Sequence, residues 1–224
     1  GLLIDVPDAT VMSFQFNFRA GNRYTLNKEI YETAHIMEHM AFGANSRFKN
    51  EHEFEAEFTK NGAYHNASTS DMSMVYVADC ADFEWDRIFD LQMLSISEPK
   101  FNEAEFLSEK GNVRNELTEY LNNNARLLWP EIQKVIGEDV LTYEERLQTI
   151  DNISLDNIKE HHKRTHTTNN LRFVIAGKID EARRSQIIDK LENLPLENGE
   201  RFELITDPLI KPSEPVYINR KDLR

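Results

Sequence analysis

Two histidines and a glutamate lie close together in the run His35-Ile36-Met37-Glu38-His39. In a helix, residues at positions i, i+3 and i+4 share one face, so these three side chains can point to the same place. Two imidazoles one turn apart can bind a single zinc ion, and a glutamate beside them can take a proton from a water molecule that the ion activates. This H-x-x-E-H pattern, the reverse of the more common H-E-x-x-H helix, predicts a hydrolytic zinc site of the inverzincin type.

The two histidines need a further partner, because a catalytic zinc site usually has three protein ligands and one open position. Glu109 and Glu116 are candidates, since both lie in a long predicted helix. They are almost two turns apart, which places their carboxylates on one stripe about 10 Å apart along the axis. One of the two carboxylates can bind the metal while the other supports the site from a second layer.

The elements that must position these residues can be read from the hydrophobic pattern. The H-x-x-E-H helix is predicted from about Asn27 to about Gly43, and it follows a half-buried strand at residues 11–19 in which apolar and polar side chains alternate. Beside the histidine face the helix carries an apolar stripe formed by Ile30, Ala34, Met37 and Ala41. We expect this stripe to pack on the sheet.

The rest of the chain alternates between further helices and strands. Helices are predicted at residues 50–61, 82–97, 102–122, 127–135, 156–162 and 181–194, and strands at residues 63–70, 73–78 and 171–176. The helix at residues 82–97 is rich in apolar side chains, and Phe83 and Trp85 are expected to be buried in it. This order predicts an α+β (mixed α/β) fold, a mainly antiparallel sheet with helices packed on it, and not a doubly wound dinucleotide-binding sheet.

Composition excludes several classes of function. The 224 residues carry a net charge of −13, so binding to nucleic acid through phosphates is not expected. No apolar stretch is long enough to span a bilayer, which predicts a soluble protein. Cys80 is the only cysteine, so an internal disulfide is excluded and a reducing, cytoplasmic compartment is favoured.

Taken together, these motifs resemble the M16 metallopeptidases, the group of pitrilysin, insulin-degrading enzyme and mitochondrial processing peptidase. The resemblance starts from H-x-x-E-H followed far downstream by Glu116, with Glu109 two turns ahead of it. It extends over nearly the whole chain through the runs Asn66-Ala67-Ser68-Thr69, Tyr143-Glu144-Glu145-Arg146 and Phe173-Val174-Ile175-Ala176-Gly177. It implies a metallohydrolase domain of the LuxS/MPP-like type and a zinc-dependent endopeptidase activity.

The resemblance also implies a role for individual residues. His35, His39 and Glu116 would bind one Zn²⁺ per chain, and Glu38 would be the general base. Glu109 would be an auxiliary catalytic carboxylate near the metal. Asn66, Ala67 and Ser68 would lie in an edge strand that pairs with a peptide or an unfolded polypeptide held in extended form.

The chain departs from the family pattern in two respects. The run Tyr31-Glu32-Thr33-Ala34 stands where the family usually has a glycine and an apolar residue, which concerns helix packing more than chemistry. Length is the larger departure, because family members pair two α/β domains around the site. We expect residues 1–195 to form the zinc-binding domain, residues 196–215 a linker, and residues 216–224 the first strand of a second M16 domain, on the same chain or a partner. The isolated chain would then be weakly active or inactive.

Three alternative readings remain open at this point. A non-catalytic M16 partner subunit would share the fold. An S-ribosylhomocysteine lyase also uses H-x-x-E-H but takes a cysteine as third ligand, which makes Cys80 a rival to Glu116. His161, His162 and His166 could form a second metal cluster, but a solvated helix end is the preferred interpretation.

Overall fold

The computed structural model describes residues 1–217 and contains within them one five-stranded sheet with the strand order β1-β5-β2-β4-β3. The strands are β1 (Leu2–Asp5), β2 (Val11–Phe18), β3 (Tyr64–Thr69), β4 (Met74–Ala81) and β5 (Leu171–Gly177). β2, β3 and β4 pair antiparallel, as do β2 and β5, whereas β1 pairs parallel with β5. The predicted mainly antiparallel sheet is therefore confirmed.

The described residues also form eight α-helices. They are α1 (Thr33–Met40), α2 (Glu51–Lys60), α3 (Trp85–Ser97), α4 (Glu103–Leu121), α5 (Asn124–Val135), α6 (Tyr143–Thr149), α7 (Leu155–Thr165) and α8 (Glu181–Glu192). Among these described helices, none combines the length and the hydropathy that a bilayer-spanning helix requires.

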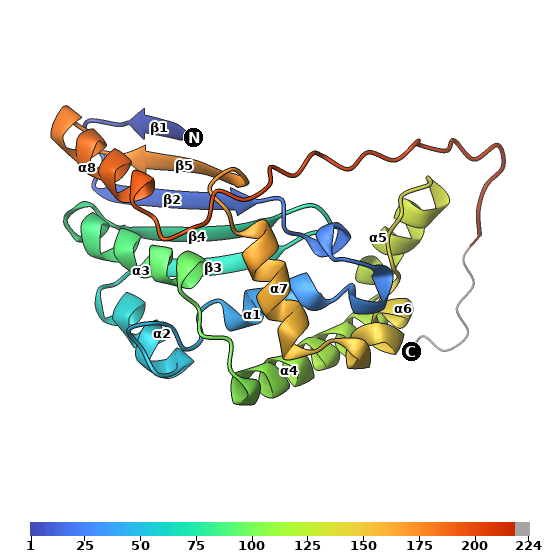
Figure 1. Ribbon diagram of the computed structural model, residues 1–224. Coiled ribbons are helices and arrows are strands. Elements are labelled where there is room, and N and C mark those ends of the chain that lie inside the picture. The colour runs from blue at the N-terminus through green and yellow to red at the C-terminus, as the bar shows by residue number, and fades with distance from the viewer. Residues whose placement is uncertain (218–224) are drawn as a thin grey trace.

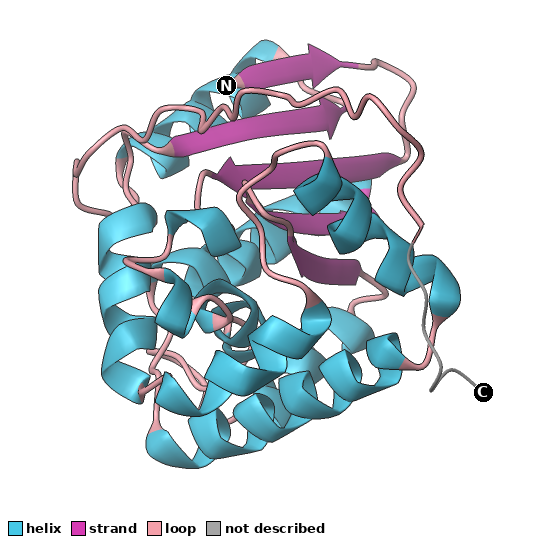
Figure 2. Ribbon diagram, turned by 90° about the vertical axis from the view of Figure 1, so that its right-hand side faces the viewer, coloured by secondary structure: helices cyan, strands magenta, loops and turns pink. Residues whose placement is uncertain are grey.

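The helices cover one face of the sheet and extend beyond its β3 edge. In Figure 1, α3, α7 and α8 lie in front of the strands, and α1 and α4 lie below β3. Figure 2 shows from the side that the helices gather on one side of the sheet and beneath it. The opposite face carries exposed polar side chains such as Gln15 and Asp79. The mixed α/β architecture with a single helical layer on the sheet agrees with the prediction.

Alternation in β2 creates the core between the sheet and the helices. Phe14, Phe16 and Phe18 are all buried, because every second residue of a strand faces the same side. Phe89 of α3 lies edge-on to Phe14 and Phe16, with ring centroids 5.7 and 5.9 Å apart. This aromatic cluster fixes α3 across the middle of the sheet.

Two local predictions differ from the structure. The helix predicted from Asn27 to Gly43 is broken, because a 3-10 turn at Lys28–Ile30 precedes α1. The Thr33 hydroxyl donates to the Ile30 carbonyl at 2.6 Å, an alternative hydrogen bond that interrupts the helical pattern. Phe83 is 82% exposed in a short 3-10 turn before α3, so its predicted burial is wrong.

The segment predicted as a linker, residues 196–215, contains no helix or strand but is held against the domain. Arg23 forms an ion pair with Asp207 at 2.6 Å, the Tyr24 hydroxyl donates to the Glu203 carbonyl, and Ile210 N–H donates to the Ile136 carbonyl. The strand predicted at residues 216–224 lies mostly outside the described residues. Its first two residues, Val216 and Tyr217, are described and are not in a strand.

The three histidines near the end of α7 do not form a solvated helix end. His161 and His166 are buried, with 4% and 2% exposed. His161 and His162 donate from Nε2 to the carbonyls of Ala20 and Ile96, and His166 is hydrogen-bonded to the Tyr76 hydroxyl at 2.8 Å. Sequence reasoning placed them in water because charged residues surround them. They instead join α7 to the sheet and to the end of α3.

These buried histidines predict a fold that weakens in mild acid. Burial lowers the pKa of His161 to about 4 and also lowers the pKa of His162 and His166. In the unfolded chain these histidines titrate near pH 6.5. Below that pH the unfolded state therefore binds more protons than the folded state. We expect the free energy of unfolding to be fully retained above pH 6.5 and to fall by up to about 1.4 kcal/mol per pH unit per histidine between pH 6.5 and 4.5.

Urea denaturation at several pH values measures this loss. In His161→Gln the slope between pH 6.5 and 4.5 should become flatter than in the wild type, whatever the variant's stability at neutral pH. His52, which is exposed, provides the control, because His52→Gln should leave the slope unchanged. An equal slope in His161→Gln and the wild type would contradict the assignment.

Candidate metal centre

α1 presents His35 and His39 on the side of the helix that faces α4. Its other side, with Ala34 and Met37, is fully buried, as the predicted apolar stripe requires. α1 packs against β3, α4 and α7, so it is fixed from three directions. The two imidazole rings lie one turn apart with their centroids 5.0 Å from each other. The sequence prediction that both rings share one face is confirmed.

Glu116 of α4 completes a group of three possible ligands. Its Oε2 lies 3.5 Å from His35 Nε2 and its Oε1 lies 3.7 Å from His39 Nε2. One donor atom from each of His35, His39 and Glu116 lies within 4.8 Å of the other two. The Glu116 side chain is 37% exposed, so the group opens to solvent on one side.

Each histidine is held at its other ring nitrogen by a second carboxylate. His35 Nδ1 lies 3.0 Å from Glu32 Oε2, and His39 Nδ1 lies 3.1 Å from Glu109 Oε2. An ionised carboxylate accepts from Nδ1–H, which leaves the Nε2 lone pair directed at Glu116. Glu109 therefore lies behind His39, on the side of the ring away from Glu116.

The charges around the group shift the pKa values of both Glu109 and His39. The hydrogen bond with His39 lowers the pKa of Glu109 despite partial burial, so Glu109 is ionised. Burial alone would lower the pKa of His39, but the hydrogen bond to Glu109 and the charges of Glu38 and Glu116 raise it. The group thus combines two imidazoles with an excess of carboxylate charge.

This donor set fits zinc. Two imidazole nitrogens and one carboxylate oxygen are a ligand combination found in catalytic zinc sites with one open position. Carboxylates at both Nδ1 atoms are the outer partners that metal-binding histidines usually have. The three converging atoms would hold the ion, and Glu32 and Glu109 would orient the rings. Cys80 is buried in β4 and is not part of this group, which removes the alternative third ligand.

Glu38 lies next to the group but is not bound by it. Its charge acts on His39 and on the buried Tyr76 of β4, whose pKa is raised by burial and further by Glu38. The carboxylate is half-buried and accepts no hydrogen bond from any side chain within residues 1–217. Its carboxylate is therefore not held by another side chain of the described residues.

The run Asn66-Ala67-Ser68 lies in β3, at the free edge of the sheet next to α1. Ser70 N–H donates to the Ser73 carbonyl, so by antiparallel alternation Ser68 and Asn66 bond to β4 while Ala67 turns its N–H and carbonyl outward. The Asn66 Oδ1 atom accepts from this outward Ala67 N–H at 2.9 Å. The predicted edge strand is confirmed, and Ala67 is the residue whose backbone faces out.

Two residues at this centre had no role in the sequence interpretation. Glu32 is fully buried, and Arg146 of α6 binds its carboxylate. The only signal for Glu32 was local, a carboxylate three residues before His35 and hence on the same side of a helical turn. Nothing in the sequence connects Arg146 to it.

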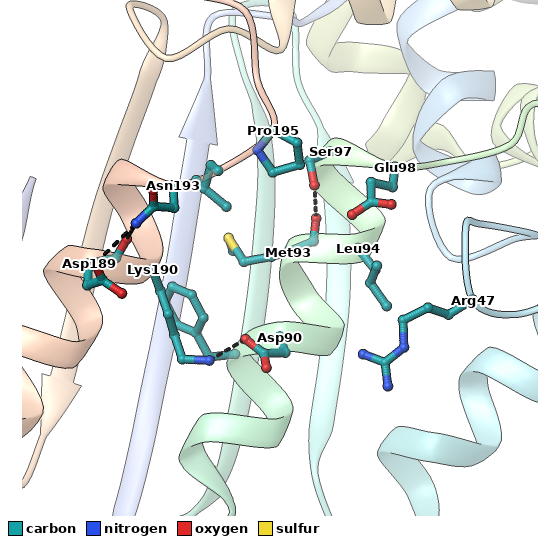
Figure 3. Close-up of a pocket in the computed structure, with 12 residues that line it drawn as sticks. Arg47, Asp90, Met93, Leu94, Ser97, Glu98, Asp189, Lys190, Asn193 and Pro195 are labelled. Atoms are coloured by element: carbon teal, nitrogen blue, oxygen red, sulfur yellow. Dashed lines mark hydrogen bonds and ion pairs between the residues drawn. The ribbon is translucent and has the colours of Figure 1, made fainter.

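A separate cavity lies elsewhere on the helical face. It has a volume of about 360 Å³ and lies between α3 and α8, where Lys190 bridges to Asp90 (Figure 3). Apolar side chains such as Met93 and Leu94 line it together with polar ones, and none of the candidate site residues does. The converging ligands lie outside this cavity, and we place the candidate centre at α1 and α4.

Known proteins that are similar to this chain include peptidases. The sequence model of the insulinase family, peptidase family M16, matches residues 3–136. No curated protein matches the chain. Similar solved structures include a peptidase M16 inactive domain from Pseudomonas fluorescens, with a TM-score of 0.79 and 14% identity over 92% of this chain and 50% of that one.

Two further structures share the fold. A protease from Helicobacter pylori has a TM-score of 0.76 and 20% identity, covering 94% of this chain and 51% of that one. Pitrilysin has a TM-score of 0.77 and 17% identity, covering 93% of this chain and 23% of that one. The chain thus spans about half the length of the first two, and at these identities the likeness shows the fold alone.

Proposed function

Because the chain belongs to the insulinase family of peptidases, family M16, we propose that it is the zinc-binding half of an endopeptidase that hydrolyses peptides held as an extended strand. The observation that carries the proposal is the convergence of His35, His39 and Glu116 within 4.8 Å, with Glu38 beside them. One similar structure is described as an inactive domain, so the argument rests on these side chains and not on the fold.

Each residue of the centre has a chemical task in this proposal. His35, His39 and Glu116 bind one zinc ion, which supplies Lewis-acid polarisation and makes water more acidic. Glu38 takes a proton from the attacking water and returns it to the leaving amine, as a general base and then a general acid. Glu109 holds the His39 ring by Nδ1, so its auxiliary role is to orient a ligand.

The edge strand β3 supports the choice of an extended peptide. Ala67 offers an outward N–H and carbonyl, and an added strand can pair with them without strict demands on sequence. In this proposal Asn66 Oδ1, which now accepts from Ala67 N–H, gives way to a carbonyl of the substrate. Ser68 lies on the same strand and keeps it attached to β4.

Backbone pairing of this kind predicts a period of two in the substrate. In a peptide that the full-length protein cleaves, N-methylation of an amide facing β3 should lower kcat/KM by about fivefold or more, because one main-chain hydrogen bond of about 1 kcal/mol is lost. Methylation of the next amide, which faces away, should have little effect. A methylation scan followed by mass spectrometry measures this pattern, and equal losses at all positions would contradict strand addition.

The proposed endopeptidase includes a second M16 domain or subunit. Relatives of known structure are about twice as long as the region they share with this chain, and the site opens to solvent beside Glu116. We propose that residues 1–195 form the zinc-binding domain, that residues 196–215 link it to a second M16 domain or subunit, and that this partner encloses the substrate.

The experiment that tests the function is a cleavage assay with the full-length protein and its second half. We expect hydrolysis of an unfolded polypeptide, loss of hydrolysis after chelation, and recovery on addition of one equivalent of zinc. A protein that binds zinc but cleaves no polypeptide would contradict the endopeptidase proposal and would favour a partner subunit.

A further inference from the structure

A buried ion pair lies directly behind His35. The Glu32 side chain is 0% exposed, and its carboxylate has a partner on each oxygen. Oε2 accepts from His35 Nδ1 at 3.0 Å and from Arg146 Nη2 at 2.9 Å, while Oε1 accepts from Arg146 Nε. A bidentate arginine contact of this kind fixes both the position and the plane of a carboxylate.

Arg146 is itself held in place by its surroundings. It comes from α6, and its guanidinium carbon lies over the rings of Tyr31 and Tyr143, 5.8 and 5.1 Å from their centroids. The Tyr31 hydroxyl donates to Asp71 at 2.9 Å, and Gln133 of α5 donates to the same carboxylate. Glu32 therefore cannot turn away from His35 without breaking its contacts with Arg146 of α6.

The two ring-holding carboxylates differ. Glu109, behind His39, has a side chain that is 16% exposed, and within residues 1–217 its one other hydrogen bond comes from the Asn112 amide. Glu32, behind His35, is fully enclosed and locked by an arginine 114 residues away in the sequence. A charge buried to this degree is costly unless it is fully paired. Its contact with an imidazole of the metal centre gives it a use beyond packing.

We propose that Glu32 is the positioning residue of His35, and that Arg146 locks it there, so that the affinity of the centre for zinc depends on α6. The hydrogen bond from Nδ1–H to Glu32 fixes the ring plane and leaves Nε2 free to face His39 and Glu116. The inference rests on the proposed zinc site, and it adds that a contact outside the three ligands sets how tightly the ion is held.

Zinc affinity and folding stability must be measured separately to test this role. The zinc Kd of the full-length protein is obtained by competition with a chromophoric chelator, and the stability of the zinc-free protein by urea denaturation. In Glu32→Gln the Kd should rise, and in the double variant Glu32→Leu/Arg146→Met it should rise by about 10- to 100-fold, the usual effect of removing an outer partner of a metal-binding histidine.

The double variant separates the two roles. Removing both charges together avoids leaving Arg146 buried and unpaired, so the zinc-free protein should keep a stability close to that of the wild type. The matched control is Asp82→Leu/Arg183→Met, which removes another ion pair between distant segments, joining α8 to the turn before α3. The zinc Kd of this control should equal that of the wild type.

The outcomes are distinct. A zinc Kd that equals the wild-type value in the double variant, or in Glu32→Gln if the double variant does not fold, overturns the role of Glu32 while the zinc site stands. A wild-type protein that binds no zinc overturns both the site and this inference. A higher zinc Kd in both Glu32 variants, with the zinc Kd of the Asp82/Arg183 control unchanged, supports the proposal.

Discussion

Replacing Glu38 with glutamine should lower kcat for peptide hydrolysis by the full-length protein by about 10²- to 10⁴-fold, the usual contribution of a general base. An amide cannot take a proton from the attacking water. Substrate binding and zinc binding should be retained, because Glu38 is neither one of the three converging ligands nor a hydrogen-bond partner of the described side chains. KM should therefore change little while kcat falls.

The measurement pairs steady-state kinetics with zinc content in the same preparation. Glu119→Gln is the matched control, because it removes the same charge at an exposed position of α4 that is not one of the three converging residues. Its kcat should equal that of the wild type. If Glu38→Gln keeps kcat within about tenfold of the wild type while zinc is bound, another group is the base.

Local pattern was sufficient to predict the part of the centre that lies on single elements. The spacing of His35, Glu38 and His39 determines one helical face whatever the rest of the chain does, and α1 presents them together. The alternation in residues 11–19 likewise predicts the buried face of β2. Such features depend on the period of one helix or strand, which the sequence contains directly.

The placement of Glu116 and β3 required more than local pattern. Periodicity puts Glu109 and Glu116 on one stripe of α4, but either could have met the histidines. The resemblance to M16 peptidases indicated Glu116 as the ligand. In the structure both carboxylates contact His39, Glu116 at Nε2 and Glu109 at Nδ1. The position of β3 at the sheet edge likewise followed from the resemblance and not from composition.

Contacts between segments that are distant in the chain could not be predicted from the sequence. Glu32 and Arg146 meet only because α6 packs near the start of α1, and α6 is so short that it was not predicted as a helix. His161 and His166 were placed in water because their neighbours in the sequence are charged. Their burial is decided by β2, β4 and α3, which lie far away in the chain.

Loss of any one of the three converging side chains should release the metal. Structural zinc sites with four ligands bind the ion with about 10–16 kcal/mol, so one ligand contributes about 3 kcal/mol or more. His39→Ala and Glu116→Gln should therefore each raise the zinc Kd by about 100-fold or more. This effect is larger than the one expected when Glu32 is replaced. At micromolar protein, zinc content after dialysis should fall from about one ion per chain to well below it.

The fold should survive these replacements, because both side chains are partly exposed and neither belongs to the hydrophobic core. Circular dichroism and urea denaturation of the zinc-free proteins check this point. Zinc should raise the unfolding midpoint of the wild type, since a ligand that binds the folded state alone stabilises it, and should leave the midpoints of the two variants almost unchanged. Equal zinc content and an equal zinc-dependent shift in Glu116→Gln and the wild type would remove Glu116 from the ligand set.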